Sequence, residues 1–311
     1  MSAARAVVFA YHDVGVRCLK TLISAGMDIP LVVTVADDPK ETQWFASVAR
    51  TAAEYGLPVM APHDANTPVV ESAVSAAQPD FIFSFYYRSL LQGPILQAAR
   101  RGALNMHGSL LPKYRGRAPV NWAILRGEKE TGATLHYMVE RADAGDIVDR
   151  QAVPILGDDD AREVFNKVTV AAETVLARSV PHLLAGSESR LRQVIEPGQY
   201  FGRRRPEDGR IDWSQSAQQI HNLVRAVAPP FPGAFASVDG ERWTFHRTRL
   251  AKRTVAPNGR ARLFGEDGKC FLACQDGGVL EVLAAAAETG AIDLPTLAVL
   301  LQRKPVVLSW T

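Results

Sequence analysis

The sequence predicts an α/β fold in which a Rossmann-like, doubly wound parallel sheet precedes a smaller antiparallel β-barrel. Two observations lead to this prediction. Apolar strand-like runs alternate with helical segments through residue 107, and from Arg203 onward short strands follow one another between Gly-containing turns. Because 311 residues exceed the usual size of one domain, about 100–200 residues, we expect two domains, at 1–190 and 200–311.

The first half of the chain alternates regularly between strand and helix patterns. An apolar strand at 5–10 precedes a helix at 14–25, in which Leu19, Leu22 and Ile23 share one side. The same alternation continues with strands at 29–35, 57–60 and 81–85 and helices at 44–55 and 69–78. Strands that alternate with helices form a parallel sheet covered by helices on both faces.

The first strand ends in a polar turn, Tyr11-His12-Asp13-Val-Gly15, which contains a single glycine. A dinucleotide site requires Gly-x-Gly-x-x-Gly so that the backbone can approach the pyrophosphate, and we therefore discount NAD. Tyr11, His12 and Asp13 should lie at the carboxyl end of the strand. Contact with a substrate and ordinary turn polarity both explain this pattern.

After residue 145 the pattern continues with a strand at 147–155. The acidic residues 158–160 are interpreted as caps of the amphipathic helix that follows at 161–184, and the small polar stretch 186–192 is the expected linker. In the second half we expect a helix at 217–226 and several short strands. Turn signals separate these strands at Asp239-Gly240, Pro257-Asn-Gly259 and Asp276-Gly-Gly278.

Candidate catalytic residues lie between positions 103 and 145. Asn105 and His107 are two residues apart in a short apolar strand, so both point to the same face. A Gly-Ser pair ends this strand, which places both side chains at its carboxyl end, where open α/β sheets hold reactive groups. Asp143 follows a second apolar segment at 134–139. An amide that stabilises an oxyanion, an imidazole that moves protons and a carboxylate that holds the charged imidazole suit acyl transfer.

The run Asn105-Met-His107-Gly-Ser-Leu-Leu-Pro-Lys-Tyr-Arg-Gly-Arg-Ala-Pro119, with Asp143 downstream, resembles the folate-dependent formyltransferases. These enzymes transfer a formyl group from N10-formyltetrahydrofolate to a primary amine. Within the family the chain is most similar to the formyltransferases that modify UDP-4-amino-4-deoxy-L-arabinose for lipid A, a modification linked to polymyxin resistance. The supporting segments are Phe9-Ala-Tyr-His-Asp13, Phe83-Ser-Phe-Tyr-Tyr-Arg88 and Phe201-Gly-Arg-Arg204.

The resemblance implies a C-terminal barrel of the open, OB-like kind and roles for individual residues. Asn105 would stabilise the oxyanion, His107 would handle protons, and Asp143 would keep His107 basic and aligned. The implied folate contacts are Ser89, Leu90, Leu91, Arg117, Val139, Glu140, Arg141, Ala142 and Asp143. The implied contacts to the acceptor are His12, Lys113, Tyr114, Arg203 and Arg204.

Two of these assignments have simpler alternatives. The Ser89 segment also fits an ordinary helix start. Lys113, Arg115 and Arg117 would suit the acidic tail of folate or a nucleotide diphosphate, because guanidinium groups pair with such oxygens, but surface solvation explains them as well.

Composition argues against several other classes of protein. Hydrophobic residues make up 47% and charged residues 22% of the chain, and no run of about 18 apolar residues is present to span a bilayer, so we expect no membrane association. The N-terminal apolar run is interpreted as a strand rather than a signal peptide. Three cysteines without Cys-x-x-Cys spacing favour a reducing cytoplasm over disulfides or structural zinc, and the histidines show no metal-ligand spacing.

Three hypotheses about the function remain open. The acceptor is a sugar-nucleotide amine in the first and methionyl-tRNA in the second. A net charge of +2 and the acidic segment 36–41 argue against nucleic acid, since phosphate recognition needs clustered Lys and Arg. The third is a non-catalytic folate- or nucleotide-binding module, which the intact Asn105, His107 and Asp143 disfavour. The identity of the amino sugar, its nucleotide and the formation of a homo-oligomer are left open.

Overall fold

We describe the fold from a computed structural model, in which residues 3–36, 43–196, 198, 200–257 and 259–308 are described. The chain divides into two compact units. Unit 1 comprises Met1–Pro119, Glu130–Pro154 and Asn166–Gly202, and unit 2 comprises Val120–Lys129, Ile155–Phe165 and Arg203–Thr311. The predicted fold class is confirmed, because unit 1 is an α/β unit on a mainly parallel sheet and unit 2 holds an antiparallel, barrel-like sheet.

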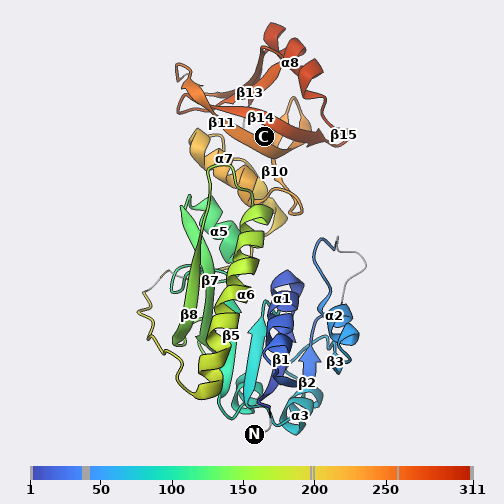
Figure 1. The fold of residues 1–311 in the computed structure, drawn as a ribbon. Coiled ribbons are helices and arrows are strands. Elements are labelled where there is room, and N and C mark those ends of the chain that lie inside the picture. Colours follow the sequence, from blue (N-terminus) through green and yellow to red (C-terminus); the bar gives the residue numbers. More distant parts are fainter. Residues whose placement is uncertain (1–2, 37–42, 197, 199, 258, 309–311) are drawn as a thin grey trace. The chain divides into compact units, whose positions relative to one another are not determined.

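Unit 1 is built on a seven-stranded sheet with the order β3-β2-β1-β4-β5-β7-β8 (Figure 1). The strands β1 to β5 run parallel to one another. At one edge β7 pairs with β5 in the antiparallel sense, and β8 pairs with β7 in the same way. The strand order reverses between β1 and β4, where open sheets form a crevice at the carboxyl ends of their strands. The strands are β1 (Arg5–Ala10), β2 (Asp28–Val33), β3 (Val59–Met60), β4 (Phe81–Phe85), β5 (Gly102–His107), β7 (Glu130–Tyr137) and β8 (Ile147–Pro154).

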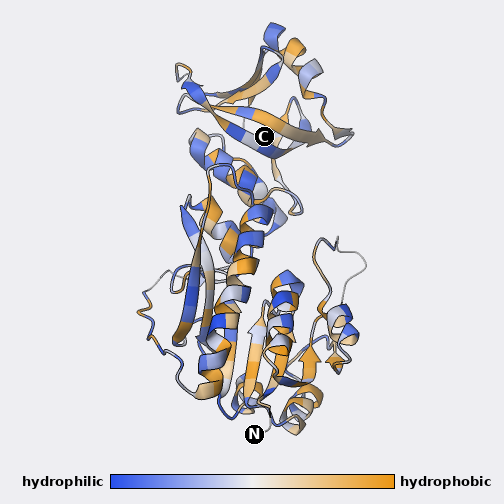
Figure 2. Ribbon diagram, in the orientation of Figure 1, coloured by the Kyte–Doolittle hydropathy of each residue, from blue (hydrophilic) through white to orange (hydrophobic). Residues whose placement is uncertain are grey.

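Helices cover both faces of this sheet. On one face α3 (Pro68–Ala76) and α4 (Gly93–Gln97) share a core with Phe9 and Ile82, and on the other α1 (His12–Ser24) packs on β1 beside α2 (Val48–Glu54). The long helix α6 (Ala161–Ala185) lies next to α1, to which an Arg17–Glu173 ion pair joins it. Strands β1 and β2 are largely hydrophobic in Figure 2, as expected for strands buried on both faces.

Helix caps follow the sequence signals closely. Asp160 accepts a hydrogen bond from the Glu163 N–H at 2.9 Å, and Glu163 accepts one from the Asp160 N–H at 2.9 Å, which confirms that these acids cap α6. Ser216 and Gln219 form the same reciprocal box at the start of α7 (Ala217–Ala226), at the bounds that the sequence predicts.

The helix predicted at 44–55 is shorter in the structure. It begins at Val48, and Ser47 is its N-cap, with a side chain that accepts a hydrogen bond from the Arg50 N–H. Trp44 and Phe45 precede the helix, and their rings pack on the imidazole of His12 with centroids 4.4 and 4.1 Å away. Trp44 and Phe45 therefore stay outside the helix, because their rings pack on His12, although their spacing in the sequence fits a helix.

The segment 186–192, predicted to be a linker, is part of unit 1. Leu191 and Ile147 exchange two backbone hydrogen bonds of 2.8 Å, and the Tyr137 hydroxyl donates to Glu188 at 2.8 Å. The prediction was wrong because the Leu191 backbone and the Glu188 side chain hydrogen-bond the neighbouring strands.

Unit 2 contains a second sheet of seven strands, in the order β10-β11-β14-β13-β12-β16 with β15 beside β14. Every pair is antiparallel, and β10 approaches β16, so the sheet nearly closes. Helix α7 packs on β11 and β14, and α8 (Leu294–Arg303) packs on β12 and β13. The strands are β10 (Ala234–Val238), β11 (Glu241–Thr254), β12 (Ala261–Glu266), β13 (Lys269–Ala273), β14 (Gly278–Ala287), β15 (Gly290–Ala291) and β16 (Val306–Leu308).

One hydrophobic core, which includes Trp213, Ile220 and Phe245, fills unit 2. The three cysteines of the chain are buried free thiols. Among the described residues, none of the helices has the length and apolar character needed to cross a membrane.

Candidate active site

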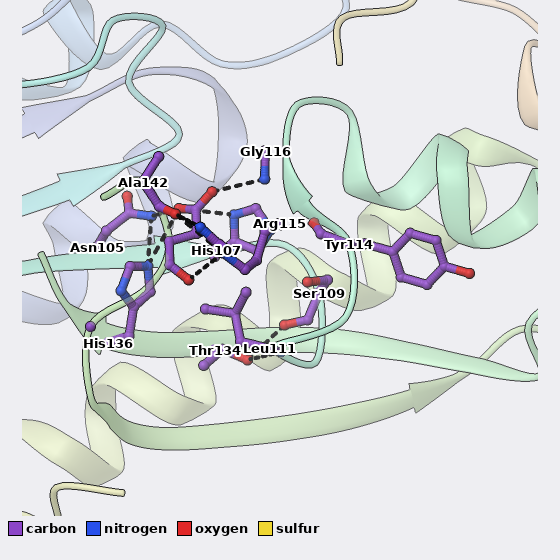
Figure 3. Close-up of polar contacts among 12 residues, drawn as sticks. Asn105, His107, Ser109, Leu111, Tyr114, Arg115, Gly116, Thr134, His136 and Ala142 are labelled. Carbon is purple, nitrogen blue, oxygen red and sulfur yellow. Dashed lines mark hydrogen bonds and ion pairs between the residues drawn. The ribbon is translucent and has the colours of Figure 1, made fainter. Parts of the chain in front are cut away.

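The three predicted catalytic residues meet at the carboxyl end of β5. Asn105 and His107 extend from β5, and the loop between β7 and β8 brings Asp143 to the same place. The Asp143 Oδ1 atom lies 3.6 Å from His107 Nδ1 and 3.5 Å from Asn105 Nδ2. Figure 3 shows Asn105, Ala142, Arg115 and Gly116 grouped around His107.

Hydrogen bonding fixes the tautomer of His107, whose side chain is 7% exposed. Its Nε2 atom lies 2.8 Å from the carbonyl oxygen of Tyr114. Because a carbonyl oxygen can only accept, Nε2 carries a hydrogen, and Nδ1 is the atom that can take up a proton. Nδ1 faces the Asp143 carboxylate, which would stabilise the imidazolium once it forms.

The Asp143 carboxylate is held at both of its oxygens. Oδ2 accepts a hydrogen bond from the Gly116 N–H at 2.9 Å, while Oδ1 faces His107 and His136, each at 3.6 Å. Burial alone would raise the pKa of this carboxyl, but the adjacent imidazoles and the Gly116 N–H more than offset it and hold the pKa well below its ordinary value. Asp143 is therefore anionic at neutral pH.

His136 belongs to this group, although it was not predicted. It lies on β7 opposite Asn105 in the strand register, and it is 1% exposed. Its Nδ1 lies 2.8 Å from the Tyr137 carbonyl oxygen, and its Nε2 lies 3.1 Å from Asn105 Nδ2 and 3.6 Å from Asp143 Oδ1. The sequence indicates only that Thr134 and His136 lie on the same face of one strand. It does not show that this strand pairs with β5, which is what brings His136 to Asn105.

Arg115 lies behind the Asp143 loop instead of facing a ligand. Its side chain is buried, and its Nε atom donates to the carbonyls of Ala142 at 3.2 Å and Asp143 at 3.1 Å. Arg115 and Gly116 form the short strand β6 (Arg115–Gly116), which pairs with β9 (Tyr200–Phe201). The expectation that Arg115 serves an anionic ligand is thus corrected, because its donors hold the Asp143 loop.

The resemblance assigns Lys113 and Tyr114 to the acceptor, but only the backbone of Tyr114 contacts the catalytic group, through its carbonyl oxygen beside His107 Nε2. The ring of Tyr114 packs on Phe201 with centroids 4.9 Å apart, and it points away from His107 in Figure 3. Both residues line a cavity of about 440 Å³, together with Glu130 and Arg150. This cavity of unit 1 is lined by Lys113 and Tyr114 but not by Asn105, His107 or Asp143.

The predicted folate contacts 89–91 and Val139 lie on two loops with exposed apolar side chains. Residues 89–91 form a loop rather than a helix start, since α4 begins at Gly93, and the Asn66 amide donates to the Leu90 carbonyl at 2.9 Å. The Leu90 and Val139 side chains are 65% and 47% exposed. Exposed apolar side chains of this kind suit the flat pterin ring of a folate, and their contact with folate stays a prediction.

The remaining predicted folate contacts lie on the same loops. Glu140, Arg141 and Ala142 belong to the segment that carries Asp143. Arg117 follows β6, has an exposed side chain and donates its backbone N–H to the Phe201 carbonyl at 2.9 Å.

His12 is the first residue of α1, and its ring stacks on Phe45. Its Nδ1 accepts a hydrogen bond from the Asp13 N–H at 2.9 Å. Burial, with a smaller contribution from Arg88, lowers the pKa of His12 to about 3. Any contact of His12 with a substrate at neutral pH would therefore involve an uncharged ring.

Arg203 and Arg204 belong to unit 2, so their contact with the acceptor stays a prediction. The guanidinium of Arg204 lies over the Trp122 ring at 5.0 Å and donates to the Asp208 carbonyl at 2.8 Å. Within the described residues, no cluster of three or more His, Cys, Asp or Glu side chains could hold a metal ion.

Several solved structures resemble this chain. An N-formyltransferase from Helicobacter canadensis, in complex with folinic acid and dTDP-3-aminofucose, has 19% identity and a TM-score of 0.73 over 90% of this chain and 99% of its own. WlaRD, a sugar 3N-formyltransferase solved with dTDP and 5-N-formyl-tetrahydrofolate, has 18% identity and a TM-score of 0.72 over 94% of this chain and 99% of its own. A sugar N-formyltransferase from Shewanella sp. FDAARGOS_354 has 17% identity and a TM-score of 0.61 over 81% and 99%.

At these identities the resemblance shows the fold. The family follows from two sequence models: the formyl transferase model matches residues 5–180, and the model of the formyl transferase C-terminal domain matches residues 204–292. The first match contains the whole Asn105, His107 and Asp143 group. The chain therefore belongs to the formyltransferase family and is an enzyme that transfers formyl groups.

Proposed function

We propose that this enzyme transfers the formyl group of N10-formyltetrahydrofolate to the primary amine of a sugar nucleotide, and that the acceptor is UDP-4-amino-4-deoxy-L-arabinose. The observation that carries the chemistry is the contact of Asn105, His107 and Asp143 at the end of β5. This group offers an amide donor, a proton acceptor and an anion, and it requires neither a nucleophilic side chain nor a metal.

Each residue has one task in the proposed reaction. Bound N10-formyltetrahydrofolate would supply the formyl carbon that the acceptor amine attacks. Asn105 Nδ2, whose hydrogen bond to Asp143 is long at 3.5 Å, can turn one N–H toward the developing oxyanion while the other stays on His136. His107 Nδ1 takes the proton that the attacking amine loses, and Asp143 stabilises the resulting imidazolium. The tetrahedral intermediate then collapses: the carbon–N10 bond breaks, the imidazolium returns its proton to N10, and tetrahydrofolate leaves.

The acceptor is proposed from sequence motifs, including Phe201-Gly-Arg-Arg204, that resemble enzymes acting on UDP-4-amino-4-deoxy-L-arabinose. In support, the Helicobacter canadensis structure is described with dTDP-3-aminofucose and WlaRD is described as a sugar 3N-formyltransferase. We propose that Lys113, Arg203 or Arg204 contacts the diphosphate, since Lys and Arg are the usual phosphate partners. On this proposal the enzyme acts in the cytoplasm, in lipid A modification.

Methionyl-tRNA is the alternative acceptor. The acidic segment that argues against it spans 36–41, and residues 37–42 lie outside the part of the chain that the structure describes, so this argument rests on the sequence alone. An enzyme that grips tRNA contacts many phosphates and loses affinity steeply as salt rises.

A formylation screen tests the proposal. The enzyme is incubated with N10-formyltetrahydrofolate and a panel of UDP-, dTDP- and GDP-linked amino sugars, with aminoacylated initiator tRNA as a separate arm at two salt concentrations. We expect a mass gain of one formyl group on UDP-4-amino-4-deoxy-L-arabinose. Efficient, salt-sensitive transfer to the tRNA with none to any sugar would overturn the proposal, and transfer to another amino sugar alone would overturn the named acceptor.

A further inference from the structure

A segment after α6 runs along the catalytic loops of unit 1. We call residues 186–196 the strap. It pairs with the start of β8 through Leu191 and Ile147, and it contacts the end of β7 through Glu188 and Tyr137. These contacts place the strap on both strands that flank the Asp143 loop.

Gln193 is the strap residue that reaches this loop. Its side-chain Nε2 donates to the Gly145 carbonyl at 2.6 Å and to the Asp143 carbonyl at 3.2 Å. The orientation of the amide is unambiguous, since the opposite one would place its oxygen against two carbonyl oxygens. Its Oε1 atom is buried and has no hydrogen-bond partner among the described residues. The two donated bonds thus form even though the oxygen is left unpaired, which is unfavourable.

The Asp143 loop has reasons to need such a restraint. Asp143 has φ +53°, a left-handed conformation that is unfavourable for a residue with a side chain. At Gly145 the backbone lies so close to Tyr137 that a Cβ atom would be 2.0 Å from the Tyr137 carbonyl oxygen. Strained residues persist only where the surrounding structure holds them.

The Asp143 peptide is held by side chains from two distant segments. Its carbonyl oxygen accepts from Arg115 Nε at 3.1 Å and from Gln193 Nε2 at 3.2 Å. The carboxylate of the same residue must reach the Gly116 N–H and face His107. Orienting the Asp143 peptide therefore also orients its carboxylate.

We propose that Gln193 is a positioning residue for formyl transfer, because it fixes the Asp143 peptide and thereby keeps the carboxylate aligned with His107. The inference rests on the role that the proposed function gives to Asp143. It adds a residue outside the catalytic motif, from a segment that is remote in sequence from the loop it holds.

The first test compares Gln193→Ala and Gln193→Glu with Val194→Ala, a matched control in the strap whose side chain is 79% exposed. Amide hydrogen exchange at Gly116 reports the bond to the Asp143 carboxylate and needs no substrate. We expect faster exchange at Gly116 in both Gln193 variants, and a kcat lowered by about tenfold or more with little change in KM, since small misplacements near the chemistry are costly. Val194→Ala should match wild type in both measurements.

The second test is a double-mutant cycle with Asp143→Asn. If Gln193 acts through Asp143, Gln193→Ala should lower kcat in the wild-type background and leave the already reduced kcat of Asp143→Asn nearly unchanged. Unaltered Gly116 exchange, or losses of kcat that multiply in the double variant, would overturn the inference. A wrong acceptor assignment would leave the exchange result intact, so the two proposals fail separately.

Discussion

His136 should act on catalysis through Asn105, although it is absent from the sequence motif. In the tautomer with its hydrogen on Nδ1, which faces the Tyr137 carbonyl, Nε2 accepts the Asn105 Nδ2–H at 3.1 Å, and the ring is 1% exposed. The informative substitutions keep the volume of the side chain. His136→Gln retains an acceptor that can face Asn105, whereas His136→Leu removes it, and truncation to Ala would add a cavity to the effect.

The expected loss can be derived from the hydrogen bond. Leaving a buried donor without its partner costs about 1–3 kcal/mol, and about 1.4 kcal/mol corresponds to a factor of ten in rate. If the freed Asn105 amide must be realigned in each turnover, His136→Leu should lower kcat by roughly 5- to 150-fold. The loss of kcat in His136→Leu should not exceed that caused by removing the oxyanion donor itself. For Asn105→Ala we expect kcat to fall by about 100- to 1000-fold.

Steady-state formyl transfer by the three variants and wild type measures these effects, with thermal unfolding as a control for folding. The kcat values should decrease in the order wild type, His136→Gln, His136→Leu, Asn105→Ala. The double variant Asn105→Ala/His136→Leu should lose little more than Asn105→Ala alone. A His136→Leu enzyme with wild-type kcat, or a double variant in which the two losses multiply, would contradict a role of His136 through Asn105.

Three further predictions follow from the site. His107→Ala should lower kcat about 100-fold or more without unfolding the protein, because a general base contributes that much, and retention of more than about a tenth of turnover would contradict its role. Since the folded pKa of Asp143 is lowered, its contribution to stability is present above its unfolded pKa, near 4, and is lost as the pH falls below that. Urea unfolding of wild type and Asp143→Asn should therefore differ less at pH 3 than at pH 7, whereas an equal difference would argue against the lowered pKa. Because the pKa of His12 is lowered to about 3, its ring should stay neutral in an NMR titration down to about pH 4. The unfolded chain takes up this proton first, so the free energy of unfolding of wild type should fall by roughly 2 kcal/mol relative to His12→Asn between pH 6.5 and pH 5. A titration midpoint near 6.5 would contradict the lowered pKa.

Elements whose signals are local were predictable from the sequence. The strand Phe81–Phe85 has its predicted bounds because a run of four apolar residues and one serine follows a Pro-Asp pair, and α7 has its predicted bounds because Ser216 and Gln219 form its capping box. The two-residue period placed Asn105 and His107 on one face of a strand, and the Gly-Ser pair that follows placed them at its end.

Features that depend on contacts between distant segments were not predictable. The start of α2 depends on Trp44 and Phe45 packing against His12, and the place of His136 depends on its register with Asn105. Residues 186–192 were predicted to be a linker because the partners of Glu188 and Leu191, which are Tyr137 and Ile147, lie far earlier in the chain. In each case the residue type was visible in the sequence and its partner was not.

The most direct test of the account is transfer of an isotope-labelled formyl group from N10-formyltetrahydrofolate to UDP-4-amino-4-deoxy-L-arabinose, followed by NMR for wild type and Asn105→Ala side by side. We expect a labelled formamide on the sugar nitrogen with wild type, formed about 100- to 1000-fold more slowly by the variant. An absence of labelled sugar with active wild-type enzyme would contradict the proposed acceptor. Equal rates for the two proteins would contradict the assignment of the reaction to the group at the end of β5.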